Sequence, residues 1–191
     1  MIHRLSKSIA DFLLKKDVVP ESEIDIYVYG YEMIILSFID FCIVASIGLM
    51  FEELFAMLTF FAVFVSVRIY TGGYHANTVL RCKLVFTMIS LSIIFLLKLK
   101  YPLLLYILIL SLFIITCIYL APVENSNKPL DKSEQMKYRK ISIALSIVWS
   151  AIALLLYFFA IKICTAITVS AFFITLLIVI ASYEKEIKAY D

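Results

Sequence analysis

His75 and Cys82 carry the side chains that a cysteine-type nucleophilic site needs, and they lie seven positions apart. In such a site a base takes the thiol proton and the sulfur attacks a carbonyl carbon. Seven residues along one continuous helix would separate the two side chains by about 10 Å, too far for a hydrogen bond. The sequence therefore predicts that His75 lies outside the helix of Cys82. The adjacent glycines, Gly72 and Gly73, would allow the chain to fold it back.

The residues around Cys82 favour its reactive thiolate form. Asn77 or Thr78 is a suitable N-cap for a helix that would contain Cys82 near its first turn. The positive end of the helix dipole and the neighbouring cations Arg81 and Lys83 both stabilise a thiolate over a thiol. Taken singly, the histidine or the cysteine would more simply be a structural residue. Together with the glycines and the cations they favour a catalytic site.

A third group that would orient His75 has two weak candidates. Asp40 is the only acid inside a hydrophobic run, and ionisable residues within membrane segments are functional suspects. Glu32 lies just before that run. Either acid would serve equally well as a structural partner of Arg68 or of another cation, so both alternatives stay open.

The remaining cysteines and the other histidine fit structural roles. Cys42, Cys117 and Cys164 fall in apolar stretches, where a thiol stays protonated and acts as a small apolar side chain. We expect His3, on the N-terminal segment, to be solvated. With one further histidine and no clustered acids, the sequence predicts no metal site and no cofactor.

The composition restricts the elements that can position these residues. Hydrophobic residues make up 63% of the 191 positions and charged residues only 17%. A soluble domain of this length cannot bury so much apolar surface, and a disordered chain would be far more polar. The net charge of +2 is too small to indicate a nucleic-acid partner. We therefore expect an integral membrane protein made of helices, which satisfy their own backbone hydrogen bonds in lipid.

Stretches without charge mark the expected membrane segments. Four are long enough to span, and only Asp40 interrupts the first of them: 33–51, 102–123, 141–161 and 163–183. Two shorter stretches, 54–67 and 84–97, can cross only by extending into residues 68–83. The sequence thus predicts an all-α integral membrane protein with six transmembrane helices over residues 33–183. An amphipathic interfacial helix and connector precede them over residues 1–32, and a tail follows over 184–191.

Lysines and arginines are unevenly distributed over this predicted topology. With the N-terminus in the cytoplasm, 14 of the 17 fall on the inner side, as the positive-inside rule requires. Both termini and the loop 122–140 are therefore predicted to be cytoplasmic. Residues 68–83 are predicted to be membrane-embedded or interfacial on the same side, either between two full crossings or as a partly re-entrant region. The cations of that loop, which include Lys128, Lys132 and Arg139, either only fix the topology or also dock an acidic peptide.

Two motifs resemble the AgrB family, the accessory gene regulator protein B of bacterial quorum-sensing systems. They comprise Arg68, Gly72-Gly73-Tyr74-His75-Ala76 and Cys82, and further along Ala121-Pro122-Val123 and Asn127-Lys128-Pro129. The chain length and the hydrophobic profile are also similar to this family, so the resemblance covers nearly the whole chain.

The resemblance implies a cysteine endopeptidase of the bacterial cell membrane that processes the AgrD pro-peptide. Cys82 would be the nucleophile and His75 its base, and Arg68 and Gly73 match positions that the family needs for activity. The enzyme would remove the acidic C-terminal tail and hold the rest as a thioester on Cys82. A cysteine of the peptide would then release it as a cyclic thiolactone. A homodimer is implied as well.

Two non-enzymatic classes compete with this interpretation. One is a small transporter or channel that exports a peptide, and the other is a membrane scaffold in which Cys82 is incidental. Six helices and Asp40 are compatible with a transporter. The lack of inverted-repeat similarity and the gathering of cations on one side argue against it. In an enzyme, Arg81, Lys83 and the basic loop would meet the acidic tail of the substrate.

Overall fold

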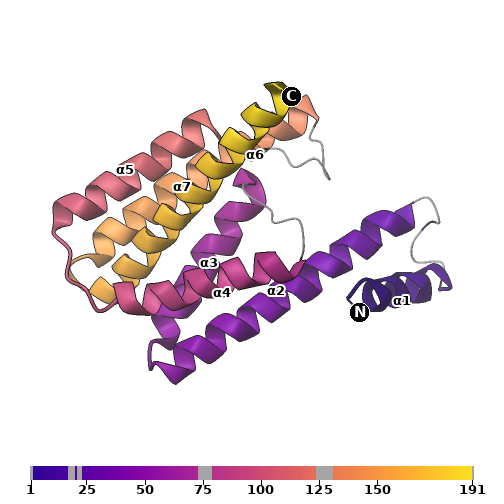
Figure 1. Cartoon of the computed structure of the whole chain (residues 1–191), viewed down its shortest axis with the longest axis horizontal. Helices are drawn as coiled ribbons and strands as arrows, with labels where there is room; N and C mark the ends of the chain where they lie inside the picture. Colours follow the sequence, from indigo (N-terminus) through magenta and orange to yellow (C-terminus); the bar gives the residue numbers. More distant parts are fainter. Residues whose placement is uncertain (1, 17–19, 21–22, 73–78, 124–130, 191) are drawn as a thin grey trace. The chain divides into compact units, whose positions relative to one another are not determined.

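A computed structural model describes residues 2–16, 20, 23–72, 79–123 and 131–190 of the chain (Figure 1). Seven helices follow one another in these ranges: α1 (Ile2–Leu14), α2 (Ile24–Met50), α3 (Leu54–Thr71), α4 (Val79–Leu96), α5 (Leu103–Tyr119), α6 (Lys132–Leu156) and α7 (Ile161–Tyr190). Within the same ranges no strand forms, and the extended pairing is an isolated β-bridge between Gly72 and Val123. The chain forms two compact units, residues 1–43 and 44–191.

Four helices, α2, α3, α6 and α7, are long and apolar enough to cross a membrane. α5 is also apolar but shorter, with 17 residues. The predicted all-α fold is thereby confirmed for the described residues, and four of its helices are candidate membrane spans. The number of six crossings, the cytoplasmic position of both termini and the domain boundaries stay predictions.

The helix bounds agree with the predicted segments in one region and differ in another. α3 and α4 have 18 residues each and reach into residues 68–83, as the two short charge-free stretches require. α2, in contrast, begins at Ile24, although the sequence predicts a connector up to residue 25 and a crossing from residue 33. No proline follows Pro20 until well past the end of α2, so nothing ends the helix early. Its 27 residues extend about 40 Å, more than the hydrocarbon core needs.

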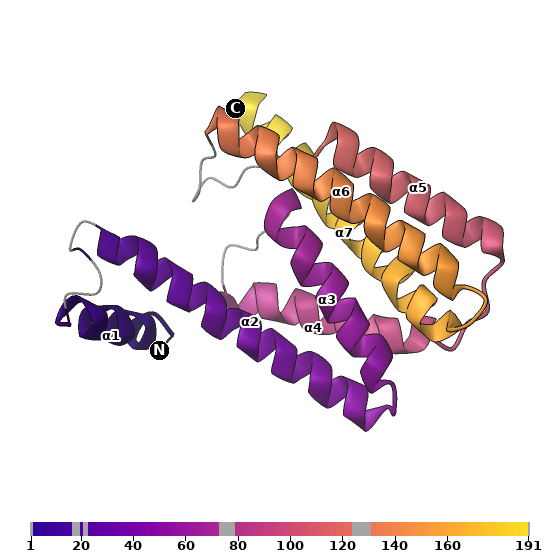
Figure 2. The ribbon, with the colours of Figure 1, turned by 180° about the vertical axis from the view of Figure 1, so that it is seen from behind.

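The core of the second unit is centred on α7, which packs against α3, α5 and α6 (Figure 1 and Figure 2). Small buried residues of α7, such as Cys164, Ala166 and Ala171, allow neighbouring helices to approach closely. The hydroxyl oxygens of Tyr106 on α5 and Thr165 on α7 lie 2.7 Å apart. Because lipid does not drive apolar helices together, close packing and such hydrogen bonds hold the bundle.

In the first unit, α1 has the amphipathic pattern expected of an interfacial helix. Its side chains Leu5 and Phe12 are 53% and 60% exposed, which suits contact with a membrane surface. His3 joins α1 to α2, because its Nδ1 lies 2.6 Å from Oε1 of Glu32. The expectation that His3 is simply solvated is therefore incomplete, since the ring is largely exposed but has a carboxylate partner.

The turn between α2 and α3 depends on a close approach at Gly48. α2 ends in a Schellman motif, in which the N–H of Glu53 donates to the Gly48 carbonyl at 2.8 Å and Glu52 has a φ of 59°. This reversal brings the start of α3 against Gly48. A Cβ at Gly48 would lie 2.9 Å from Cα of Leu54 and 3.1 Å from Cβ of Met57. Only a residue without a side chain fits there without a shift of α3.

We predict that Gly48→Ala lowers the apparent melting temperature of the protein in detergent, because overpacking costs about 1–3 kcal/mol. Gly30→Ala is the matched control, since both glycines lie in α2 and a Cβ at Gly30 would have nothing within 4 Å. At Gly30 the better helix propensity of alanine should raise stability by about 0.5–1 kcal/mol. Equal shifts in the two variants would contradict the close approach at Gly48.

Candidate active site

Cys82 lies in the first turn of α4 as the structure describes that helix, and its side chain is half-buried. One turn further along, the ring of Phe86 packs against Phe60 and Phe64 of α3, with centroids 5.9 and 5.4 Å apart. Residues four apart share one face of a helix, so Cys82 lies on the face of α4 that is directed toward α3. The aromatic contact therefore shows that Cys82 belongs to the packed surface between α3 and α4.

Arg68 lies one turn beyond Phe64 on α3. Its guanidinium carbon lies 5.6 Å from the centre of the Phe64 ring, within the range of a cation–π contact. The guanidinium nitrogen Nη1 is buried, and the group interacts electrostatically with Cys82. A buried cation on α3 and the cysteine sulfur on the facing side of α4 thus belong to the same helix pair. A cysteine sulfur in such a place can attack a carbonyl carbon.

The end of α3 pairs with the segment that follows α5. The N–H of Val123 donates to the carbonyl oxygen of Thr71 at 2.9 Å, and Gly72 forms a parallel β-bridge with Val123. Gly72 has a φ of +66°, and a Cβ there would lie 2.1 Å from the carbonyl oxygen of Val123. Glycine alone fits such a position. The close contact with Val123 therefore explains why position 72 is a glycine. Because Gly72 belongs to the first sequence motif and Val123 to the second, this contact brings the two motifs together.

A capping box fixes the start of α6, where the predicted docking cations lie. The side chain of Asp131 accepts hydrogen bonds from the N–H of Lys132 at 2.7 Å and from the Ser133 hydroxyl at 3.0 Å. These bonds, that from Ser133 first, hold the pKa of the Asp131 carboxyl below its usual value. Because the cap determines where α6 begins, it also determines where Lys132 and Arg139 lie on the helix surface. These two residues are seven positions apart and share one face.

A polar pocket of about 290 Å³ opens beside this face of α6. α6 contributes Gln135 and Arg139, and residues 119–122 form the other wall. Arg139 donates to the carbonyl oxygen of Ile118 at 2.6 Å, so it also satisfies the end of α5. The wall formed by residues 119–122 leads directly into Val123. The pocket is therefore continuous in the chain with the segment that anchors the end of α3.

Several predicted site residues lie elsewhere or outside the described residues. Arg81 is exposed and Lys83 half-buried on either side of the cysteine. His75, Gly73 and Lys128 lie outside the described residues, as do both predicted caps of α4. The expected folding back of the histidine toward the cysteine therefore stays a prediction.

The two candidate third residues both belong to α2. Glu32 lies against His3, as described above, and Asp40 is half-buried. The role of either acid in orienting His75 stays a prediction.

Two contacts near the site have no signature in the side-chain pattern. One is the backbone hydrogen bond between Thr71 and Val123. The other joins Tyr70 of α3 and Tyr138 of α6, whose rings pack edge-on with centroids 5.5 Å apart. The one feature of the sequence that pointed to the backbone contact was Gly72 with its neighbouring glycine, because adjacent glycines indicate a close approach of backbones.

Comparison with known proteins identifies the family. The accessory gene regulator B (AgrB) family model matches residues 6–180, which is most of the chain. The chain belongs to the AgrB family. None of the curated proteins or solved structures compared with it matches. AgrB membership and the four long apolar helices together indicate a membrane protein of a quorum-sensing family.

We predict that Gly72→Ala breaks the pairing at the end of α3 in this AgrB-family chain. The added Cβ would collide with the Val123 carbonyl, and the positive φ would strain an alanine by about 1–3 kcal/mol. Hydrogen exchange read by mass spectrometry should become faster at the Val123 amide, which donates to Thr71. The Leu120 amide, which donates to Thr116 at 2.9 Å, should keep its protection. An unchanged rate at Val123 would argue against the pairing.

Arg68→Gln should slow the alkylation of Cys82 by a small neutral thiol reagent several-fold at fixed pH, because a buried positive charge that attracts the reacting sulfur is lost. Peptide mapping separates Cys82 from the other cysteines. Cys117 and Cys164 are buried as the sequence predicts, whereas Cys42 is exposed. Arg81→Gln is the matched control, since it removes the same charge from an exposed side chain that water screens. If Arg81→Gln slowed the reaction as much, Arg68 would have no special effect on the sulfur.

Proposed function

We propose that this AgrB-family chain is a membrane cysteine endopeptidase and acyl transferase that processes an AgrD-like autoinducer pro-peptide. The observation that carries the proposal is the half-buried Cys82 in the first turn of α4, on the face that packs against α3, in a chain of the AgrB family. His75 is the proposed base, and the proposed site faces the cytoplasm at the surface of the bacterial cell membrane. A homodimer is part of the proposal on the strength of the family alone.

The proposed chemistry consists of two acyl transfers. The Cys82 thiolate attacks the carbonyl carbon at the junction with the C-terminal tail, and the tail leaves as an amine that takes a proton from His75. The peptide is then a thioester on Cys82. The thiol of the peptide cysteine gives its proton to His75, and its sulfur attacks the same carbonyl. This closes the thiolactone ring and displaces the Cys82 thiolate, which restores both the starting sulfur and the protonated His75.

The second transfer requires that water be kept from the intermediate. It replaces one thioester by another, so the bond type is conserved, whereas hydrolysis would release a linear acid. A half-buried sulfur between two apolar helices limits access of water. This requirement explains why such a reaction would be carried out at a membrane rather than in a soluble domain.

The acidic tail of the substrate is complementary to the cations near the site. Lys132 and Arg139 lie on one face of α6, and the polar pocket lies beside that face. We place the tail along this face, because the pocket wall leads through Val123 to the end of α3. Arg81, Lys83 and Lys128 are the further cations proposed for this contact.

Co-expression with a pro-peptide that has an amphipathic leader, an internal cysteine and an acidic tail tests the proposal. With the wild-type chain, mass spectrometry should find the released tail and the cyclic peptide. Both products should be lost in Cys82→Ala and in His75→Ala, which remove the nucleophile and the base. Cys42→Ala, which alters an exposed cysteine of α2, is the matched control and should keep both.

Two outcomes would count against the proposal in different ways. Cleavage that survives Cys82→Ala would remove Cys82 as the nucleophile. Export of an uncleaved peptide by every variant would support the transporter or scaffold alternative instead.

A further inference from the structure

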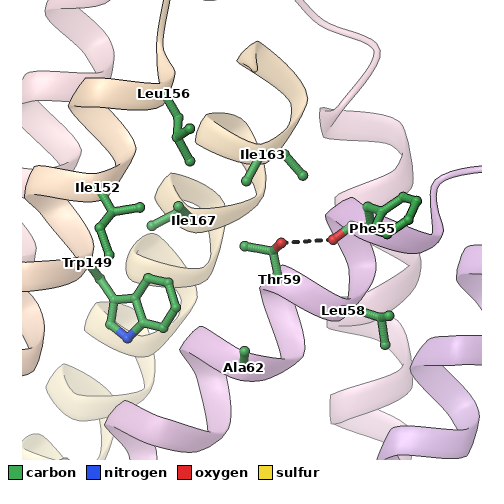
Figure 3. Close-up of a pocket in the computed structure, with 9 residues that line it drawn as sticks. All are labelled: Phe55, Leu58, Thr59, Ala62, Trp149, Ile152, Leu156, Ile163 and Ile167. Atoms are coloured by element: carbon green, nitrogen blue, oxygen red, sulfur yellow. Dashed lines mark hydrogen bonds between the residues drawn. The ribbon is translucent and has the colours of Figure 1, made fainter. Parts of the chain in front are cut away.

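An apolar groove lies between α3, α6 and α7, away from the proposed catalytic residues (Figure 3). Its volume is about 410 Å³. Trp149 and Ile152 of α6 line one side, Phe55 and Ala62 of α3 line the other, and Ile167 of α7 is fully buried beneath them. We call this feature the α3–α6–α7 groove. Ala62 contributes only a methyl group, which leaves room opposite the indole of Trp149.

The polar side chains that line the groove already have hydrogen-bond partners. The indole N–H of Trp149 donates to Oγ of Ser66 at 3.1 Å. The hydroxyl of Thr59 donates to the Phe55 carbonyl at 2.8 Å (Figure 3). A polar ligand would lose its own hydrogen bonds on entering such a groove, whereas an apolar ligand would lose none. The groove therefore favours an apolar occupant.

The length of the groove is suited to part of an acyl chain. The groove follows α3 from Phe55 to Ala62, which is about 10 Å along the helix axis. An acyl chain is much thinner than a helix and can lie along such a groove. All three helices have the length and composition of membrane spans, so acyl chains are the medium next to the groove.

One end of the groove carries charged groups of the kind found at the level of lipid head groups. Lys162 precedes the lining residue Ile163 and forms an ion pair with Glu53, just before the start of α3. Charged residues are excluded from the hydrocarbon core and gather at the ends of membrane helices. A phospholipid with one chain in the groove would place its ester and phosphate groups near this ion pair.

We propose that the α3–α6–α7 groove binds one acyl chain of a membrane phospholipid, which enters from the Lys162 end. Lipid tails are as apolar as the groove, so transfer from the bilayer gains nothing from the hydrophobic effect. The gain comes from dispersion contacts with walls that are otherwise incompletely filled. This lipid site does not depend on the chemistry proposed for Cys82.

Trp149 is the only tryptophan of the chain, so its fluorescence reports on the groove alone. The full chain would be reconstituted in phosphatidylcholine bilayers that contain increasing fractions of phospholipid with brominated acyl chains, which quench tryptophan. Ala62→Phe fills the groove and should reduce the quenching by about twofold, because the brominated acyl chain then loses its contacts with the walls of the groove. Ala151→Phe, at an exposed position of α6 outside the groove, should be quenched like the wild type. Ala62→Leu is a smaller filler for the case that the phenylalanine prevents folding.

Two results would overturn the proposal. Equal quenching in the wild type and in both filled variants would mean that only bulk lipid reaches Trp149. Quenching that is absent in the wild type and appears when the protein is diluted in the bilayer would mean that a second copy of the chain covers the groove.

Discussion

The pairing of Gly72 with Val123 is the constraint from which the candidate site is built. In an apolar chain the backbone groups at the end of a helix need partners, and here the Thr71 carbonyl receives the Val123 N–H. Gly72 has a positive φ at this contact, where α3 ends. Val123 directly follows residues 119–122, which form one wall of the polar pocket. The contact therefore connects the end of α3 with the segment that lines the pocket.

Packing between α3 and α4 supplies the second half of the site. Phe86 lies against two phenylalanines of α3, and one turn from these rings Arg68 interacts with Cys82. The contact between the phenylalanine rings sets how α3 aligns with α4, and this alignment sets the position of Arg68 relative to α4. In the proposed mechanism the chemistry is thus carried by polar groups at the end of an apolar helix pair, where water is scarce and charge is effective. The basic face of α6 belongs to the same unit and is fixed by its own cap at Asp131.

The hydrophobic pattern was sufficient to predict the all-helical membrane architecture, because long apolar stretches have few alternatives in lipid. It did not predict the start of α2 at Ile24, because Pro20 and the acids of residues 17–25 resemble a connector, whereas nothing after Pro20 prevents a helix from starting there. Residue types and spacing singled out Arg68 and Cys82. They could not show the hydrogen bond between Thr71 and Val123, since backbone groups are alike at every position. They could not show the α3–α6–α7 groove either, which arises from the small Ala62 facing a tryptophan of another helix.

The central claim is that Cys82 carries the peptide as a thioester. The most direct measurement is the intact mass of the purified chain after brief reaction with a pro-peptide whose internal cysteine is replaced by alanine, so that the ring cannot close. We expect an adduct with the mass of the tail-less peptide, located on Cys82 and removed by hydroxylamine. Release of the tail with no adduct on Cys82 at any time would contradict the claim.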